Sequence, residues 1–194
     1  MDSRKRSSRY TKSLDNQARE RDAVGHLLGL EPRFQKPSSA IKRRILELLS
    51  LPKEGEWTHQ TFDLIVTTPG TPPITEENVE IYIDAIALVE VKATRKAIKN
   101  TALNGFFFGT TDRQYQLARA AGNRYWYAFI VLSAENEYGH PFYVLLPLEE
   151  VERRTQSKRL QYQVSFRTDS EPSGEPASVV PEALLRQVKA EVEP

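Results

Sequence analysis

The chain has 194 residues, of which 39 % are hydrophobic and 27 % charged, enough apolar material for one domain with modest extensions. The absence of cysteine excludes disulfides, iron–sulfur clusters and thiol nucleophiles, and the three histidines are too scattered for a histidine-built metal site. No apolar run reaches the ~20 residues that span a bilayer, and none follows the charged N-terminus, so we expect a soluble cytoplasmic protein without a membrane partner.

The net charge of +1 hides an uneven distribution along the chain. Residues 1–44 hold 12 Lys or Arg against 5 Asp or Glu, whereas the remainder is net acidic. A basic segment binds a polyanion by releasing its condensed counterions, although a solvated tail and a solvated helix face would have the same composition. The predicted nucleic-acid contacts are Arg4, Lys5, Arg6, Arg9, Lys42, Arg43 and Arg44.

The N-terminal part is predicted to hold a basic flexible arm over residues 1–12 and then two helices. Apolar residues recur at helical spacing over residues 15–30, and Gly29 with Pro32 ends this segment. A second helix is expected from Ser39, a candidate N-cap, to just before Pro52.

The middle of the chain is predicted to be mostly extended. Residues 57–67 form one expected strand and residues 79–93, rich in β-branched side chains, a second and longer one. A Pro- and Gly-rich turn separates them. Residues 94–109 are expected to be irregular.

The C-terminal part is predicted to contain one more helix and three strands. Thr111 and Gln114 match a capping box, and Gly122 follows the helix that they open. The order of elements indicates a mixed α/β domain over residues 13–167, followed by a linker and a short amphipathic helix over residues 168–194. The three expected strands cover residues 125–133, 141–146 and 159–167.

Acidic and basic side chains meet in the predicted strands. Glu90 and Lys92 alternate with Val91, so they project from the same face, and as a plain ion pair they would be worth under ~1 kcal/mol. Asp63 interrupts an apolar strand and needs a cation or a donor. If the two strands pair antiparallel, Asp63 comes opposite Glu90, and both carboxylates can hold one Mg²⁺. Asp84 lies ~20 Å along an unbroken strand from Glu90 and is expected to be structural or to make a surface contact.

These residues resemble the PD-(D/E)XK nuclease superfamily. The matching pieces are residues 62–65, the run Leu-Val-Glu-Val-Lys-Ala-Thr over residues 88–94, and the helix and strand that follow it. The resemblance implies a restriction endonuclease-like αβββαβ core with a central mixed sheet flanked by helices. Phe62 stands where the family has the proline of its name.

The resemblance also implies roles for individual residues. Asp63 and Glu90 would ligate Mg²⁺, for which Mn²⁺ can substitute, and Lys92 would assist the attacking water. Glu20, in the first helix, would be a further metal ligand, directly or through water, or else a solvated helix carboxylate. Gln114 is engaged by the capping box, which leaves Gln116 as the possible active-site contact.

The function that this resemblance implies is a Mg²⁺-dependent endonuclease that hydrolyses DNA to 5′-phosphate ends. A type II restriction endonuclease acting as a homodimer, with one site for each strand, is the expected form. A DNA repair or junction-resolving nuclease is the alternative within nucleases. A non-catalytic nucleic-acid-binding module, in which Glu90 and Lys92 form a plain ion pair, is the alternative outside them.

Overall fold

The structure, a computed structural model, describes residues 18–49, 51, 61–158 and 161–165. The predicted basic arm, with Arg4, Lys5, Arg6 and Arg9, lies outside the described residues, as do the linker and terminal helix predicted within residues 168–194. No helix in the described part of the chain is both long and apolar enough to cross a membrane.

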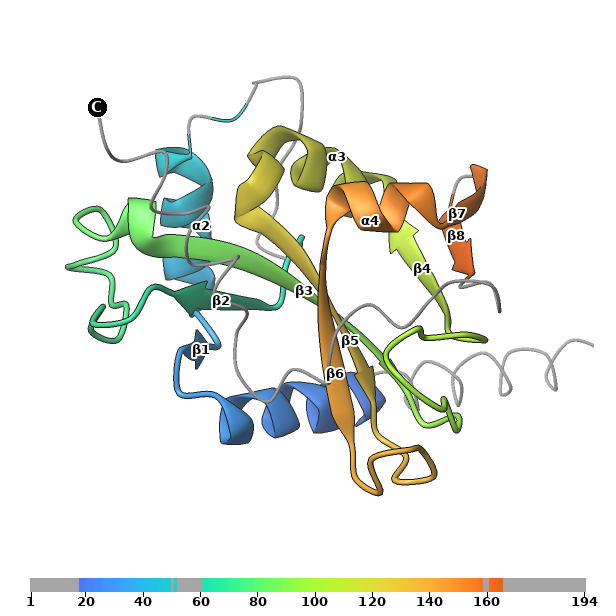
Figure 1. The fold of residues 1–194 in the computed structure, drawn as a ribbon. Helices are drawn as coiled ribbons and strands as arrows, with labels where there is room; N and C mark the ends of the chain where they lie inside the picture. The colour runs from blue at the N-terminus through green and yellow to red at the C-terminus, as the bar shows by residue number, and fades with distance from the viewer. Residues whose placement is uncertain (1–17, 50, 52–60, 159–160, 166–194) are drawn as a thin grey trace, which may run out of the picture.

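A five-stranded mixed sheet forms the centre of the fold (Figure 1). Its central strand β3 pairs with β5 in parallel, and all the other pairs of neighbours are antiparallel. Among the three inner strands, β5 is continuously apolar and β3 is apolar over its first four residues, because both faces of the sheet are covered there. In spatial order the strands are β1 (Phe34–Gln35), β2 (Leu64–Thr67), β3 (Ile86–Thr94), β5 (Tyr125–Val131) and β6 (Phe142–Pro147).

Helices cover the two faces of this sheet. The first helix, described over residues 18–30, buries Ala23 and Leu27 against one face. On the opposite face, α2 (Ser39–Leu48) and α3 (Asp112–Ala121) contribute Ile45 and Leu117 to the larger core cluster. The short helix α4 (Leu148–Arg153) follows β6. The mixed α/β class predicted from the sequence is therefore confirmed.

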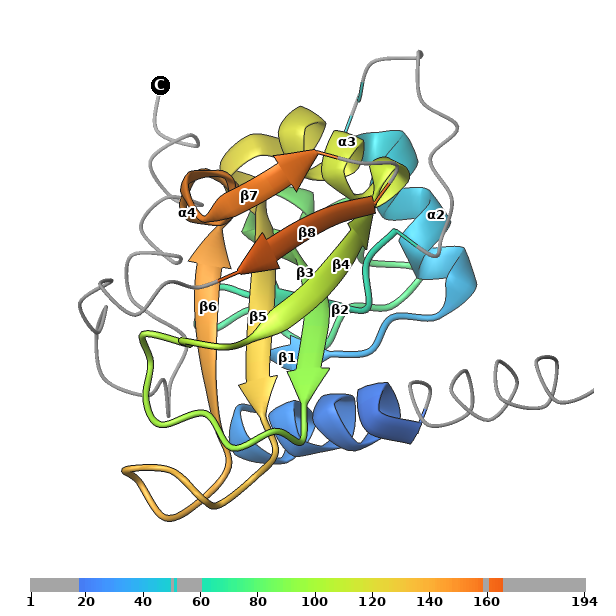
Figure 2. The ribbon, with the colours of Figure 1, turned by 90° about the vertical axis from the view of Figure 1, so that its right-hand side faces the viewer.

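A second, antiparallel sheet packs beside the first. It has the order β4 (Phe107–Thr111), β8 (Gln161–Ser165) and β7 (Thr155–Lys158). Figure 2 shows it in front of β3, β5 and β6, and Figure 1 shows it to one side of the same strands. Ring contacts join the sheets, because the centroids of Phe106 and Phe108 lie 5.4 and 4.7 Å from that of Phe129. This packing brings β4 close to the end of β3.

Several predicted boundaries were wrong. The N-cap of α2 is Ser38, whose hydroxyl accepts a hydrogen bond from the Ile41 amide, and not Ser39. The single strand predicted over residues 79–93 begins only at Ile86. Residues 75–82 form helical turns instead, and η1 (Ile83–Ala85) is a 3₁₀ turn. The Asn78 side chain initiates these turns by accepting from the Thr75 amide, which outweighs the β-branched composition.

Other elements follow the prediction more closely. The capping box of α3 is present, and the predicted strands over residues 125–133 and 141–146 correspond to β5 and β6. In contrast, β4 lies in a segment predicted to be irregular, and neither α4 nor β7 was predicted.

Candidate functional site

A polar cleft of about 510 Å³ is lined by the second half of β3, by β4 and by the first turn of α3. Figure 2 shows these three elements next to one another. The first helix and the residue before β2 complete its walls. The charged and amide side chains that line the cleft are Arg19, Glu20, Asp63, Glu90, Lys92 and Gln114.

The register of β2 on β3 brings Asp63 and Glu90 together. Leu64 pairs with Val89, so the next position along each strand places Asp63 opposite Glu90, and both line the cleft. Asp63 Oδ2 accepts a 2.7 Å hydrogen bond from the Val91 amide. One carboxylate oxygen is thus used to fix the side chain against β3. The antiparallel pairing that the sequence suggested is observed.

Glu90 is the most buried acid of the cleft, with 3 % of its surface exposed. Its Oε1 accepts hydrogen bonds from Lys92 Nζ at 2.7 Å and from Gln114 Nε2 at 2.5 Å. Its Oε2 is buried and has no hydrogen-bond partner among the described residues. Burial raises the pKa of Glu90 to about 8, with further increases from Asp63 and Glu20, although Lys92 opposes them.

Glu20, from the first helix, lines the cleft next to Asp63. Glu20 is exposed, but partial loss of solvent around its carboxyl group raises its pKa, as do the charge of Asp63 and a side-chain hydrogen bond between the two acids, while Lys92 and Lys36 lower it. Two carboxyl groups can share a hydrogen bond only if one of them keeps a proton. The first helix therefore adds a third acid to this corner of the cleft, as the sequence suggested.

Gln114, and not Gln116, is the glutamine of the cleft. Gln114 accepts from the Thr111 amide at 3.0 Å as part of the capping box, and it also contacts Glu90 and, at 3.4 Å, Lys92. The sequence argument that the capping box excludes other contacts was wrong, because a carboxamide has both a donor and an acceptor group. Gln116 lies two positions further along the helix, on a different face, and is exposed.

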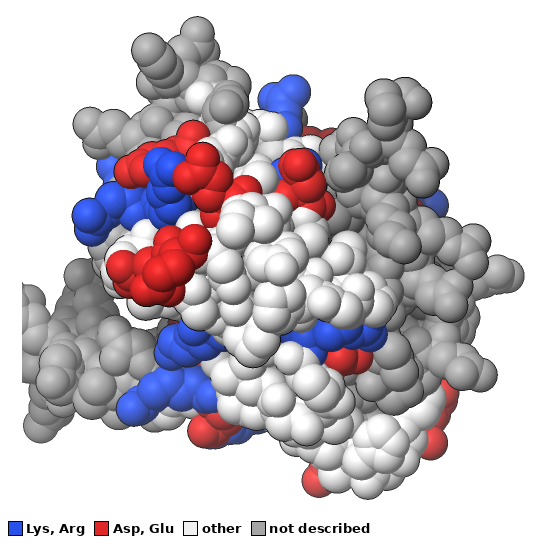
Figure 3. Space-filling model, turned by 90° about the vertical axis from the view of Figure 1, so that its left-hand side faces the viewer, with Lys and Arg blue, Asp and Glu red and all other residues white. Residues whose placement is uncertain are grey.

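The three consecutive basic residues of α2 have different environments. Lys42 is half-buried and donates a 2.5 Å hydrogen bond to the Phe62 carbonyl, with its Nζ 4.9 Å from the centre of the Phe62 ring. Arg44 pairs with Glu47 and Glu80. Figure 3 shows Lys and Arg interspersed with Asp and Glu over the described residues of this side. Arg43 is exposed, and no ion pair is described for it. The three residues therefore offer fewer available positive charges to a nucleic acid than the sequence suggested.

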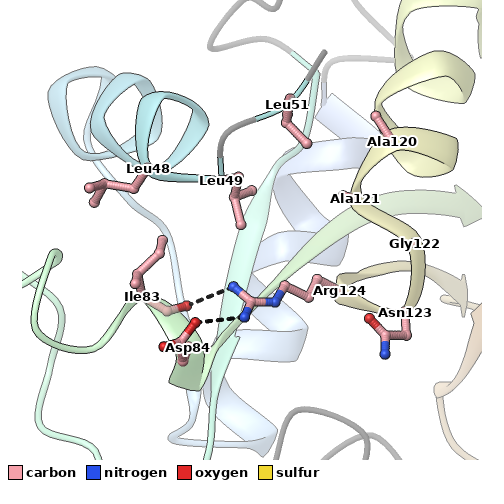
Figure 4. A pocket seen from close by; sticks show the side chains of 10 residues that line it. All are labelled: Leu48, Leu49, Leu51, Ile83, Asp84, Ala120, Ala121, Gly122, Asn123 and Arg124. Carbon is pink, nitrogen blue, oxygen red and sulfur yellow. Dashed lines mark hydrogen bonds and ion pairs between the residues drawn. The ribbon is translucent and has the colours of Figure 1, made fainter. Parts of the chain in front are cut away.

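Asp84 lies in a different hollow from the acids of the polar cleft. This hollow, of about 640 Å³, lies between the end of α2, η1 and the turn after α3 (Figure 4). Arg124 reaches across it to Asp84 at 2.7 Å and to the Ile83 carbonyl at 3.4 Å. The other lining residues are mostly apolar, so the hollow offers less chemistry than the polar cleft.

The donor set of the cleft suits a hard divalent cation. Asp63 and Glu90 supply carboxylate oxygens, and the unpartnered Glu90 Oε2 is a buried acceptor that a cation would satisfy. Within residues 18–49, 51, 61–158 and 161–165, no three His, Cys, Asp or Glu side chains are placed to hold one ion by themselves. Mg²⁺ usually keeps several waters and takes one or two carboxylates, so two protein acids are sufficient.

Sequence reasoning did not place Arg19, Phe107 and Gln114 in the cleft, nor Lys42 near its acids. Lys42 was predicted as a nucleic-acid contact together with Arg43 and Arg44. The one sequence signal that distinguishes it from them is its position on the face of the helix that points toward the apolar core. In comparisons with known proteins, no family model, curated protein or solved structure matches the chain significantly.

Proposed function

We propose that this chain is a Mg²⁺-dependent endonuclease of DNA, of the PD-(D/E)XK type, with Mn²⁺ as an alternative ion. The observation that carries the proposal is the grouping of Asp63, Glu90 and Lys92 in one cleft, with a buried Glu90 oxygen that has no partner among the described residues. The first helix, β1, β2, β3, α3 and β5 follow one another in the order αβββαβ, and all four of these strands belong to the central sheet, which supports such a core. In this reading α2 is an insertion before β2, and β4 of the smaller sheet is an insertion before α3.

Each polar side chain then has a defined task. Asp63 and Glu90 would hold the ion, and Glu20 would add negative charge beside them, directly or through water. When bound, the ion would polarise the scissile phosphate and lower the pKa of a water molecule. Lys92, which is held by Glu90 and Gln114, would orient the attacking water or stabilise the negative charge that develops on the phosphate. The 3′ oxygen would leave, which gives a 5′-phosphate.

The test is cleavage of a varied plasmid set with Mg²⁺ and with EDTA. We expect Mg²⁺-dependent cutting by the wild type, and its loss by at least 100-fold in Lys92→Ala with DNA binding retained. Lys99→Ala, which removes an exposed lysine outside the cleft, is the matched control and should cut at the wild-type rate. Equal cutting by Lys92→Ala, or cutting that EDTA does not affect, would contradict the proposal.

The form of the substrate separates the two kinds of nuclease. Discrete fragments from intact duplex would support a type II restriction endonuclease, for which one site in each chain requires a homodimer to cut both strands. Preferential cutting of branched DNA would support a repair or junction-resolving nuclease. The basic arm of residues 1–12 would supply phosphate contacts in either case.

A non-catalytic nucleic-acid-binding module is the second candidate. The 2.7 Å contact between Lys92 Nζ and Glu90 Oε1 favours it, because Lys92 already has a protein partner without a metal ion or a phosphate. In that case Mg²⁺ and Mn²⁺ would leave the melting temperature unchanged. A metal-dependent rise that Glu90→Gln abolishes would favour the nuclease instead.

A further inference from the structure

Phe107 is an exposed aromatic side chain on the wall of the polar cleft. Four large hydrophobic side chains are exposed in the described part of the chain, and Phe107, at 57 %, is the one of these four that lines the cleft with Glu90 and Lys92. Folding of the chain does not require an aromatic side chain to be exposed on the wall of a polar cleft. Because it lines the same cleft as the acids, an exposed ring here is available to a ligand that binds in the cleft.

The neighbours of Phe107 hold it in this position. Phe106 and Phe108 pack their rings on Phe129 at 5.4 and 4.7 Å between centroids. Because successive side chains of a strand point to opposite faces, these anchors turn Phe107 away from the core. Gly105, at φ +81°, provides the turn that leads into the strand. The ring is therefore presented by a fixed backbone, which lowers the entropy lost when a ligand stacks on it.

A lysine accompanies the exposed ring. Lys96 Nζ lies 5.9 Å from the centre of the Phe107 ring and 3.4 Å from the Gly105 carbonyl. Because Lys96 Nζ lies over one face of the ring, a base that stacks on Phe107 would use the opposite face while its phosphate meets the cation.

We propose that Phe107 and Lys96 form a subsite for an unpaired nucleotide beside the acids of the cleft, an inference that rests on the proposed nuclease function. A base inside an intact duplex is covered on both faces by its neighbours, so a protein ring can stack only on a base that is unpaired or turned out of the helix. The subsite therefore selects DNA with a single-stranded or extrahelical nucleotide near the reacting phosphate. This substrate class favours the repair or junction-resolving form of the nuclease.

The experiment measures binding without cleavage, with the full chain in EDTA. Three oligonucleotides of equal length are compared: a single strand, an intact duplex, and a duplex with one bulged 2-aminopurine. We expect wild-type protein to quench the 2-aminopurine fluorescence. It should also bind the single strand and the bulged duplex more tightly than the intact duplex. Phe107→Ala should weaken both about 5- to 100-fold and change duplex binding less than twofold, whereas Phe107→Trp should keep the preference.

Two matched controls separate this effect from general changes. Ile81→Ala removes a side chain that is 75 % exposed and outside the cleft, and it should leave all three affinities unchanged. Lys96→Gln should reduce the salt dependence of single-strand binding by about one phosphate contact, whereas Lys99→Gln should not.

Several outcomes would overturn the subsite. If Phe107→Ala binds all three oligonucleotides like the wild type, or weakens duplex binding equally, Phe107 does not select unpaired bases. In that case Mg²⁺-dependent cutting that Lys92→Ala abolishes would leave the nuclease proposal standing. If the substitution changes the sedimentation coefficient but no affinity, Phe107 belongs to a protein interface. Wild-type protein that binds none of the three would overturn both proposals.

Discussion

Glu90 should make the stability of the metal-free protein depend on pH. Its pKa is about 8 in the folded chain, mainly because of burial, against an ordinary value of 4.5. Between these two values the unfolded chain has lost the Glu90 proton and the folded chain keeps it. The folded state then binds more protons, so its stability falls as the pH rises from 4.5 and levels off above about 8.

The size of the effect follows from the same two pKa values. Each pKa unit corresponds to about 1.4 kcal/mol, so the pH-dependent loss between pH 5 and pH 7.5 is about 3 kcal/mol. Glu90→Gln removes this titration and retains a similar shape and an oxygen for Lys92. The other titrating groups near the cleft, which include Glu20 and Lys42, are present in both proteins and largely cancel in the difference.

The assay is urea unfolding of both proteins in EDTA from pH 5 to pH 9. We expect the wild type to lose about 3 kcal/mol relative to Glu90→Gln between pH 5 and pH 7.5, and the difference to stay constant above about pH 8. A difference that does not change over this range would contradict a raised Glu90 pKa. It would mean that Glu90 is ionised in the folded chain at pH 5.

Three further substitutions test other parts of the structure. Gln114→Ala should lower the free energy of unfolding in urea by about 1–2 kcal/mol, because the capping box is lost. Gln116→Ala, at an exposed position, should change it by less than about 0.5 kcal/mol. Equal effects of the two substitutions would contradict the capping role of Gln114. Phe129→Ala should cost about 3–5 kcal/mol in the same assay because the ring is fully buried between the sheets, and a cost below about 1 kcal/mol would argue against that packing. Asp84→Ala should cost under about 1 kcal/mol and leave any cleavage activity intact, since its bond to Arg124 lies at the surface outside the cleft; loss of cleavage would place Asp84 in the site.

The sequence predicted the fold best where local and tertiary preferences agree. β5 was predicted because its seven residues are all apolar and buried on both faces, and α3 because its capping box is a local signal. The strand that ends at Thr94 was predicted too long, because β-branched residues over 79–85 pack in helical turns. β4 was missed because a strand with Gly109 and an exposed Phe107 has no clear alternation, and its partner β8 is more than 50 residues away.

The candidate site was predictable to the extent that strand pairing determines it. Alternation along β3 placed Glu90 and Lys92 on one face, and an antiparallel partner brought Asp63 to them. Gln114 and Phe107 could not be derived in this way, because their positions depend on how α3 and β4 pack across the end of β3. A sequence shows which residues share a strand, but not which loops and helices cover its end.

The bond between the Asp63 carboxylate and the Val91 amide has a consequence for side-chain length. The Asp63 amide also binds β3, at the Val89 carbonyl, so both ends of this residue are held by the same strand. A glutamate here has one more methylene group than this span allows, and it would lose either the amide bond or its place in the cleft. Position 63 therefore discriminates between the two acidic amino acids by reach alone.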